Sequence, residues 1–173
     1  VAADGRSLIT SIGIRHSALW IHDSRGDRPL STDGYVPVLE TAGLFGAAPM
    51  FSRDGRWLFY LKRSSRTSGA ELWRTDLESE HSEPVLSGVA IMEYDISDDA
   101  AEAVFSTQPS SGNTQVWLAA LDRRSPPRLL CSAGEDSPHF GPNGQILVRV
   151  TEGGTHYVER IDRHGSARSR VVP

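Results

Sequence analysis

The side chains best placed for chemistry are a histidine and two carboxylates that lie close together in the sequence. Glu135 and Asp136 precede His139 by three or four residues. Such a group could form a carboxylate–imidazole site, in which the carboxylates orient the ring or share a metal with it. A local hydrogen-bond network is the more common arrangement for these residue types, and we favour it. We therefore predict no metal and no cofactor.

Sequence patterns typical of catalysis are absent from the chain. It contains no Gly-x-Ser-x-Gly, no His-Glu-x-x-His, no glycine-rich phosphate loop and no calcium loop. The six histidines have no metal-ligand spacing, and the acidic cluster Glu78, Glu80 and Glu83 is most simply a solvated edge. Cys131 is the single cysteine, so neither an intramolecular disulfide nor a cysteine-based metal site can form. We predict a chain that is not an enzyme.

Composition limits the partners that this chain can have. Of its 173 residues, 38% are hydrophobic and 23% are charged, which is typical of a globular protein. The net charge is −4, and Lys62 is the single lysine. Nucleic-acid binding needs a clustered basic surface, so we expect none. No apolar stretch approaches the roughly 20 residues of a membrane-spanning helix, so we expect no membrane insertion by this segment.

A short motif occurs four times and organises the chain. Its copies are Ala2-Ala3-Asp4-Gly5, Phe51-Ser52-Arg53-Asp54-Gly55, Ile96-Ser97-Asp98-Asp99-Ala100 and Phe140-Gly141-Pro142-Asn143-Gly144. The turn residues at 4, 54, 99 and 143 are separated by 50, 45 and 44 positions. A period of about 45 residues built from short strands is typical of β-propeller blades.

The fold class predicted is therefore all-β, a β-propeller of about four antiparallel, four-stranded blades. We expect one array over 1–173, with blades at about 1–31, 47–88, 91–131 and 136–173. The first blade lacks its inner strand, because the chain begins at the turn that should follow it. We expect an incomplete ring, a fragment of a larger propeller, whose open ends can associate with another copy.

The repeated turns and tryptophans have structural explanations. Asp-Gly and Asn-Gly tolerate positive φ, so Asp4-Gly5, Asp54-Gly55 and Asn143-Gly144 predict tight two-residue turns between antiparallel strands. Asp99-Ala100 departs from this rule and predicts a different, bulged turn. Trp20, Trp73 and Trp117 recur in the third strand of their blades, and we expect them to pack between blades. A platform for sugars or bases is the less favoured alternative.

The repeats resemble the TolB-like family of WD-repeat-type propellers. The matching pattern runs from Pro49 through Phe51-Ser52-Arg53-Asp54-Gly55-Arg56-Trp57-Leu58-Phe59, and continues as Glu71-Leu72-Trp73-Arg74-Thr75-Asp76-Leu77. Members of this family serve as periplasmic binding proteins, as gating domains of serine peptidases and as sensor halves of bacterial kinases and winged-helix regulators. The resemblance implies a bacterial propeller, usually of six blades, and a periplasmic or extracytoplasmic location.

One face of the array is the better candidate for binding. Because strand direction alternates, the loops between second and third strands share a face with the connections from one blade to the next. These loops are long and polar, and Ser31–Ala47 is the longest. The candidate contacts on this face are Arg15, His16, Tyr35, Arg63, Arg66, Gln108, Asn113, Glu135, Asp136 and Glu152.

The function that we predict is a non-enzymatic module for protein–protein interaction or ligand sensing. Its partner would be a protein or a small ligand. The alternative is a regulatory or gating propeller of a larger enzyme, a serine peptidase or a serine/threonine kinase, whose catalytic domain is not in this chain.

Overall fold

The computed structural model describes residues 18–31, 48–63 and 69–172. Its regular structure is β-strand apart from one 3₁₀ turn, η1 (Pro142–Gly144). The strands are β1 (Leu19–Asp23), β2 (Gly26–Ser31), β3 (Met50–Phe51), β4 (Trp57–Arg63), β5 (Ala70–Asp76), β6 (Ser82–Ile91), β7 (Glu93–Ile96), β8 (Glu102–Thr107), β9 (Gln115–Ala120), β10 (Arg128–Cys131), β11 (Asp136–Phe140), β12 (Ile146–Glu152), β13 (Thr155–Ile161) and β14 (Arg168–Val172).

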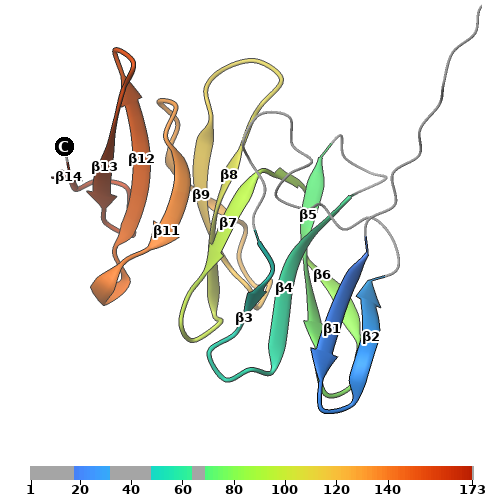
Figure 1. The fold of residues 1–173 in the computed structure, drawn as a ribbon. Coiled ribbons are helices and arrows are strands. Elements are labelled where there is room, and N and C mark those ends of the chain that lie inside the picture. The colour runs from blue at the N-terminus through green and yellow to red at the C-terminus, as the bar shows by residue number, and fades with distance from the viewer. Residues whose placement is uncertain (1–17, 32–47, 64–68, 173) are drawn as a thin grey trace, which may run out of the picture.

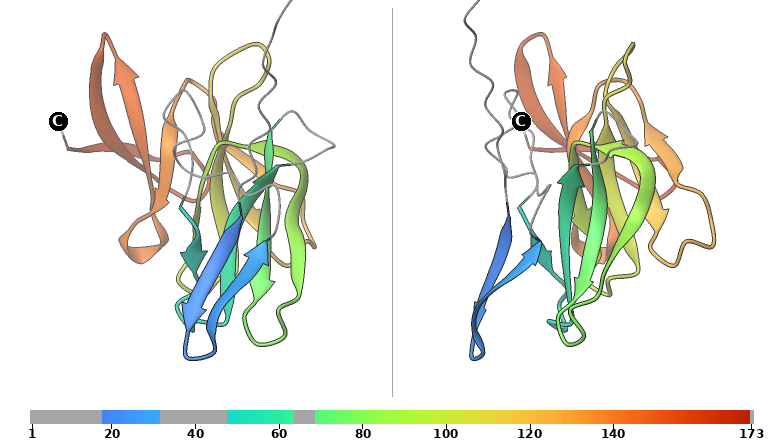
Figure 2. Two further views of the ribbon diagram at one scale, coloured as in Figure 1. Left: turned by 45° about the vertical axis from the view of Figure 1, so that its right-hand side comes forward. Right: turned by 90° about the vertical axis from the view of Figure 1, so that its right-hand side faces the viewer.

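The strands form successive antiparallel sheets. Three sheets have four strands each, β3–β6, β7–β10 and β11–β14, and we name them blades 2, 3 and 4. In the residues described, the first sheet has two strands, β1 and β2. Figure 1 shows the sheets side by side in chain order, and Figure 2 shows that the row does not close into a ring. The expected β-propeller fold and its incomplete ring are confirmed.

The loops divide between two ends of the blades. The loops β8–β9 and β12–β13 lie at one end, which we name the loop face (Figure 1). The turns β3–β4 and β7–β8 lie at the opposite end, which we name the turn face (Figure 1). This is the arrangement that alternating strand direction requires.

Two apolar clusters fill the seams between neighbouring blades. Phe59, Leu61 and Leu72 of blade 2 belong to one cluster, together with Ala103 and Phe105 of blade 3. The other cluster contains Val104 and Val116 of blade 3 with Ile146, Val148 and Ile161 of blade 4. Successive side chains of a strand point to opposite faces, so β8 contributes Ala103 and Phe105 to one seam and Val104 to the other. Because β8 lies between two seams, it carries apolar side chains on both of its faces.

The turns of blades 2 and 3 are built by the same serine and aspartate. Ser52 Oγ accepts a hydrogen bond from the backbone N–H of Trp57 (2.9 Å) and donates to Asp54 Oδ1 (2.5 Å). In blade 3, Ser97 Oγ accepts from Glu102 N–H (2.9 Å) and donates to Asp99 Oδ1 (2.7 Å). Each serine hydroxyl thus accepts a hydrogen bond from a backbone N–H that would otherwise need a backbone carbonyl.

Two expectations about these turns are wrong. Ser52 N–H donates to Trp57 O (2.9 Å), so residues 53–56 separate the paired strand ends, more than the two expected. Asp99-Ala100 does not form a different turn, because Ala100 adopts the positive φ of Gly55, 53° against 72°. The serine and aspartate hold this conformation even where alanine replaces glycine.

The turn that differs is that of blade 4. Gly141 stands where blades 2 and 3 have Ser52 and Ser97, and the chain forms the 3₁₀ turn η1 instead. Asn143 and Gly144 both adopt positive φ, 60° and 70°. That backbone conformation is the reason these residue types are favoured here. Asp4 and Gly5 lie outside the described residues.

The three tryptophans have different environments. Trp117 is half-buried and packs against the cluster between blades 2 and 3. Trp73 is half-buried too, with the Lys62 ammonium 4.7 Å from its ring centre. The expectation for Trp20 is wrong, because its side chain is 62% exposed. Exposure alternates along β1, and Trp20 lies on the outward side of this hairpin with His22.

Candidate binding groove between blades 2 and 3

A groove lies on the seam between blades 2 and 3, toward the loop face. Its main cavity has a volume of about 420 Å³. The lining residues are Gly88, Val89, Ala90, Phe105, Thr107, Gln108, Pro109, Trp117 and Pro127. A second cavity of about 240 Å³ shares Val89 and Pro127 with it and continues along the seam to Ala120 and Arg123. The two cavities form one elongated, mostly apolar groove.

An irregularity in β6 opens this groove. Leu86 pairs with Leu72 and Ile91 pairs with Ala70, so residues 87–90 lie opposite the single residue Glu71. The buried Glu71 carboxylate accepts a hydrogen bond from the Gly88 N–H (2.8 Å), and Gly88 has a φ of 77°. Glycine adopts such angles without steric cost. Residues 88–90 therefore bulge out of the ladder and form one wall of the groove.

The opposite wall comes from neighbouring strands of blade 3. Phe105 pairs with Trp117 across β8 and β9, so both rings lie on the side of the sheet that faces blade 2. Trp117 Nε1 donates a hydrogen bond to Thr107 Oγ1 (3.1 Å), which fixes the indole. Gln108 holds its own loop, because its amide donates to Gly112 O (3.2 Å) and accepts from Thr114 Oγ1 (2.9 Å).

The groove has the chemistry of a binding site. None of the residues that line the main cavity is ionisable. Thr107 Oγ1 accepts from Trp117, so its hydroxyl proton can be donated to a bound acceptor. Among the described residues, no group of three or more His, Cys, Asp or Glu side chains could hold a metal ion. The described part of the chain also contains no helix long and apolar enough to cross a membrane.

The candidate contacts predicted from sequence have varied places in the structure. Gln108 lines the groove, and Asn113 is exposed in the same β8–β9 loop. Arg63 is exposed at the end of β4. Glu152 accepts a hydrogen bond from the Tyr157 hydroxyl (3.2 Å) beside the β12–β13 turn. Four further candidates lie outside the described residues: Arg15, His16, Tyr35 and Arg66.

Glu135 and Asp136 are engaged in ion pairs within the protein. Glu135 is 2% exposed, and its carboxylate accepts from Arg168 (2.6 Å) and from the backbone N–H of Ala133 (2.8 Å). These contacts hold the pKa of Glu135 below its ordinary value despite burial, which by itself raises it. Asp136 accepts both hydrogen bonds of a bidentate Arg149 pair, at 2.7 and 2.8 Å. For Glu135, the expectation of a ligand contact is wrong.

His139 does not form a network with these two carboxylates. Its Nδ1 lies 3.5 Å from Asp95 Oδ2, on the inner strand of blade 3. The prediction of a local hydrogen-bond network among Glu135, Asp136 and His139 is therefore wrong, and so is the alternative of a carboxylate–imidazole site. Strand pairing sends neighbouring side chains of β11 in different directions, so closeness in sequence was a poor guide.

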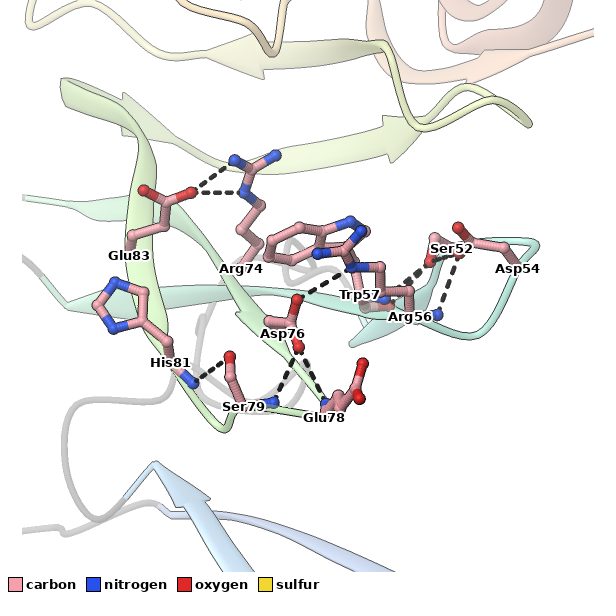
Figure 3. Close-up of polar contacts among 10 residues, drawn as sticks. All are labelled: Ser52, Asp54, Arg56, Trp57, Arg74, Asp76, Glu78, Ser79, His81 and Glu83. Carbon is pink, nitrogen blue, oxygen red and sulfur yellow. Dashed lines mark hydrogen bonds and ion pairs between the residues drawn. The ribbon is translucent and has the colours of Figure 1, made fainter.

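A polar network closes the strand ends of blade 2 on the turn face. Figure 3 shows Trp57 between the guanidinium groups of Arg56 and Arg74, at 5.1 and 4.2 Å from the ring centre. Arg56 Nε donates to Asp76 Oδ2 (3.0 Å), whose other oxygen accepts from the N–H groups of Glu78 and Ser79. Every polar group named here has a partner inside the blade, so we assign this network to structure.

Comparison with known proteins agrees with the architecture. No family model and no curated protein matches the chain. Among solved structures, TolB from Acinetobacter baumannii superposes with a TM-score of 0.63 and 19% identity over 88% of this chain and 37% of its own. A putative TolB from Agrobacterium tumefaciens gives 0.65 and 18%, over 90% of this chain and 56% of its own. The β-propeller domain of the Trilobed protease from Pyrococcus furiosus gives 0.60 and 13%, over 88% and 48%.

These similarities identify the fold class of the chain. The chain is a β-propeller module, and its fold is TolB-like. It spans between 37% and 56% of the length of these three structures. At this level of identity the likeness extends to the fold and not to the activity of any of these proteins.

Proposed function

We propose that this chain is a non-enzymatic recognition module that binds an extended, apolar segment of another protein in the groove between blades 2 and 3. The observation that carries the proposal is the groove itself. Its main cavity of about 420 Å³ falls within the roughly 300–1,000 Å³ typical of ligand pockets. It also lies toward the loop face (Figure 1), where Gln108 and Pro109 of the β8–β9 loop line it.

The shape of the groove favours an extended segment over a compact ligand. Its two cavities join at Val89 and Pro127, so a bound chain would run along the seam. Arg123, in the second cavity, is paired with Glu83 at 3.0 Å. A neutral apolar segment therefore fits without leaving a charge unpaired, and the Thr107 hydroxyl is placed to donate to one of its carbonyl groups.

The groove supports binding rather than catalysis. A hydroxyl group needs an adjacent base to become a nucleophile. Thr107 Oγ1 has a donor, Trp117 Nε1, at 3.1 Å, and the main cavity is lined by no histidine, cysteine or carboxylate.

Selection from a random peptide library on the immobilised chain tests the proposal. The selected peptides should be apolar and should bind the chain in solution. Pro109→Glu and Pro127→Glu each place a charge at the groove and should weaken binding at least ten-fold, because an apolar segment would have to desolvate that charge. Val171→Glu is the matched control, since Val171 is 49% exposed on β14 of blade 4, away from the groove. Equal loss of binding in all three variants would overturn the proposal.

A further inference from the structure

The inner strand of blade 4 is held to blade 3 by carboxylates. Glu93 and Asp95 alternate along β7, so both point toward β11. Glu93 Oε2 accepts from the backbone N–H of Ser137 (2.7 Å), and Asp95 Oδ2 accepts from that of Phe140 (2.8 Å). Asp95 Oδ1 accepts from its neighbour Ile96 N–H (2.9 Å), and the Asp95 residue is 8% exposed. Side-chain oxygens thus act across this seam as backbone carbonyls act within a sheet.

The seam between blades 2 and 3 is joined in another way. There the Tyr94 hydroxyl donates to Phe59 O (2.9 Å), a contact between two groups that are neutral at physiological pH. Ion pairs cross both seams, Arg123–Glu83 between blades 2 and 3 and Arg163–Glu102 between blades 3 and 4. The seam between blades 3 and 4 adds carboxylates that accept from backbone N–H groups, and a histidine lies beside one of them. His139 Nδ1 is 3.5 Å from Asp95 Oδ2, the oxygen that accepts from the adjacent residue Phe140.

We propose that Asp95 and His139 form a proton-sensitive clasp that holds β11 on β7 more firmly when the imidazole is protonated. A protonated ring keeps the Asp95 carboxylate in place against the Phe140 N–H through charge. Loss of the proton removes this attraction at the Phe140 contact, while Glu93 still accepts from the Ser137 N–H and Arg163 still pairs with Glu102 across the same seam. Blade 4 therefore opens from blade 3 more readily as the pH rises.

The charges around His139 favour this direction of change. Asp95 and Glu93 face it from β7, and both are acidic. Its own strand carries Asp136, which is neutralised by Arg149 of β12 at 2.7 Å. The contact with Asp95 raises the pKa of His139 above its ordinary value of 6.5, against the desolvation of partial burial. A raised pKa means that the clasp is fully present below pH 6.5 and is lost as the pH rises through the pKa of the folded protein.

Amide hydrogen exchange of the full chain, followed by NMR between pH 5.5 and 9, tests the clasp. We expect the protection factor of the Phe140 amide to fall about two- to five-fold over this range, since the His139 side chain is 64% exposed and the pair is partly screened. The midpoint of this fall should match the titration of the His139 ring protons.

Two variants separate the clasp from general effects of pH. His139→Asn should keep the fold and abolish the pH dependence of Phe140 protection. Tyr94→Phe weakens the neighbouring seam and should leave that pH dependence intact. The proposal is overturned if Phe140 protection does not change with pH in the natural sequence, or if the same change persists in His139→Asn.

Discussion

Phe105 and Trp20 show that burial depends on position within a blade rather than on residue type. Phe105 is 1% exposed, because β8 lies between two seams and its side chain fills one of them. Trp20 is larger and equally repeated in the sequence, yet it is 62% exposed on the outward side of the β1–β2 hairpin. The sequence repeat places both in strands, and the packing partner decides which of them contributes to stability.

Replacement of Phe105 by alanine should therefore be costly. We expect Phe105→Ala to lower the free energy of unfolding by about 3–5 kcal/mol, the range for removing a buried aromatic side chain. Trp20→Ala should change it by less than about 0.5 kcal/mol, as exposed positions do. Urea midpoints at fixed m-value measure both. A larger loss for Trp20→Ala than for Phe105→Ala would contradict the packing described.

Single residues were also where sequence reasoning about the site was weakest. The long-loop argument selected Gln108, which lines the groove, and Glu135, which is buried in an ion pair with Arg168. A charged residue in a loop looks the same in sequence whether it faces solvent or an arginine 33 positions away. The contact between His139 and Asp95 was missed for the same reason. The residues that meet between two blades cannot be predicted from the sequence of either blade alone.

At the scale of elements, the sequence predicted where the turns of blades 2 and 3 lie, but not their four-residue length or the conformation that Ala100 shares with Gly55. Ser52 and Asp54 were recognised as a turn, and so were Ser97 and Asp99. Strand positions follow from the apolar runs on either side. The bulge in β6 was not foreseen, although Gly88 inside a strand pattern is the signal for one. That bulge forms a wall of the groove, which is why most groove residues were missed.

Ala100→Gly should stabilise the turn of blade 3. Ala100 adopts a φ of 53°, a conformation that costs a residue with a side chain about 1–2 kcal/mol. Glycine removes this strain and costs about 0.5–1 kcal/mol in backbone entropy, so the net gain should be about 0.5 kcal/mol. Thermal unfolding measures it. Ala101→Gly, at the next and exposed position, should lower the melting temperature, and a similar rise in both variants would contradict the explanation.

Three aspartates at the end of a third strand, in the first sheet and in blades 2 and 4, should make the fold sensitive to acid. Hydrogen bonds lower the pKa of Asp23, Asp76 and Asp162 to about 2, chiefly from the Arg28 side chain, the Ser79 N–H and the Ser166 hydroxyl respectively. A lowered pKa in the folded state contributes stability above the ordinary value of 3.8, and this is lost as the pH falls toward 2.

Melting temperatures at pH 2 to 6 check this prediction. Asp76→Asn should melt below the natural sequence at pH 6, and the two should converge as the pH approaches 2. Asp98→Asn is the control, because that side chain is 88% exposed and pairs only with the exposed Arg53 among the contacts described for it. A constant difference between Asp76→Asn and the natural sequence across the whole range would contradict the assignment.

At the scale of the whole molecule, the repeat in the sequence was enough to predict a propeller. Apolar faces between blades and the two opposite loop faces follow from alternation along each strand. Expected self-association through the open ends stays a prediction, as do the identity of the partner and the blade boundaries. These depend on surfaces that no repeat specifies, because each surface residue is free to differ from blade to blade.

Binding in the groove and binding at the turn face predict opposite effects of a charge reversal at Glu78. If the groove is the binding site, Glu78→Lys on the turn face should leave the affinity of a selected peptide within about two-fold, since Glu78 contributes its backbone N–H to the Asp76 network and its side chain is exposed. Isothermal titration of the natural and variant chains with the same peptide measures this. A ten-fold loss in Glu78→Lys would place the partner at the wrong end of the blades for our proposal.

The measurement that tests the central claim most directly is a map of backbone amide chemical shifts on titration with the tightest selected peptide. We expect the largest shifts at residues 88–90, at Thr107 and Gln108 and at Trp117, with saturation at a common midpoint. The Trp117 indole N–H should move as well, because the Thr107 hydroxyl that it contacts would donate to the peptide. Shifts confined to the turns at 52–56 and 97–101, with the groove unchanged, would contradict the proposal that this propeller binds its partner between blades 2 and 3.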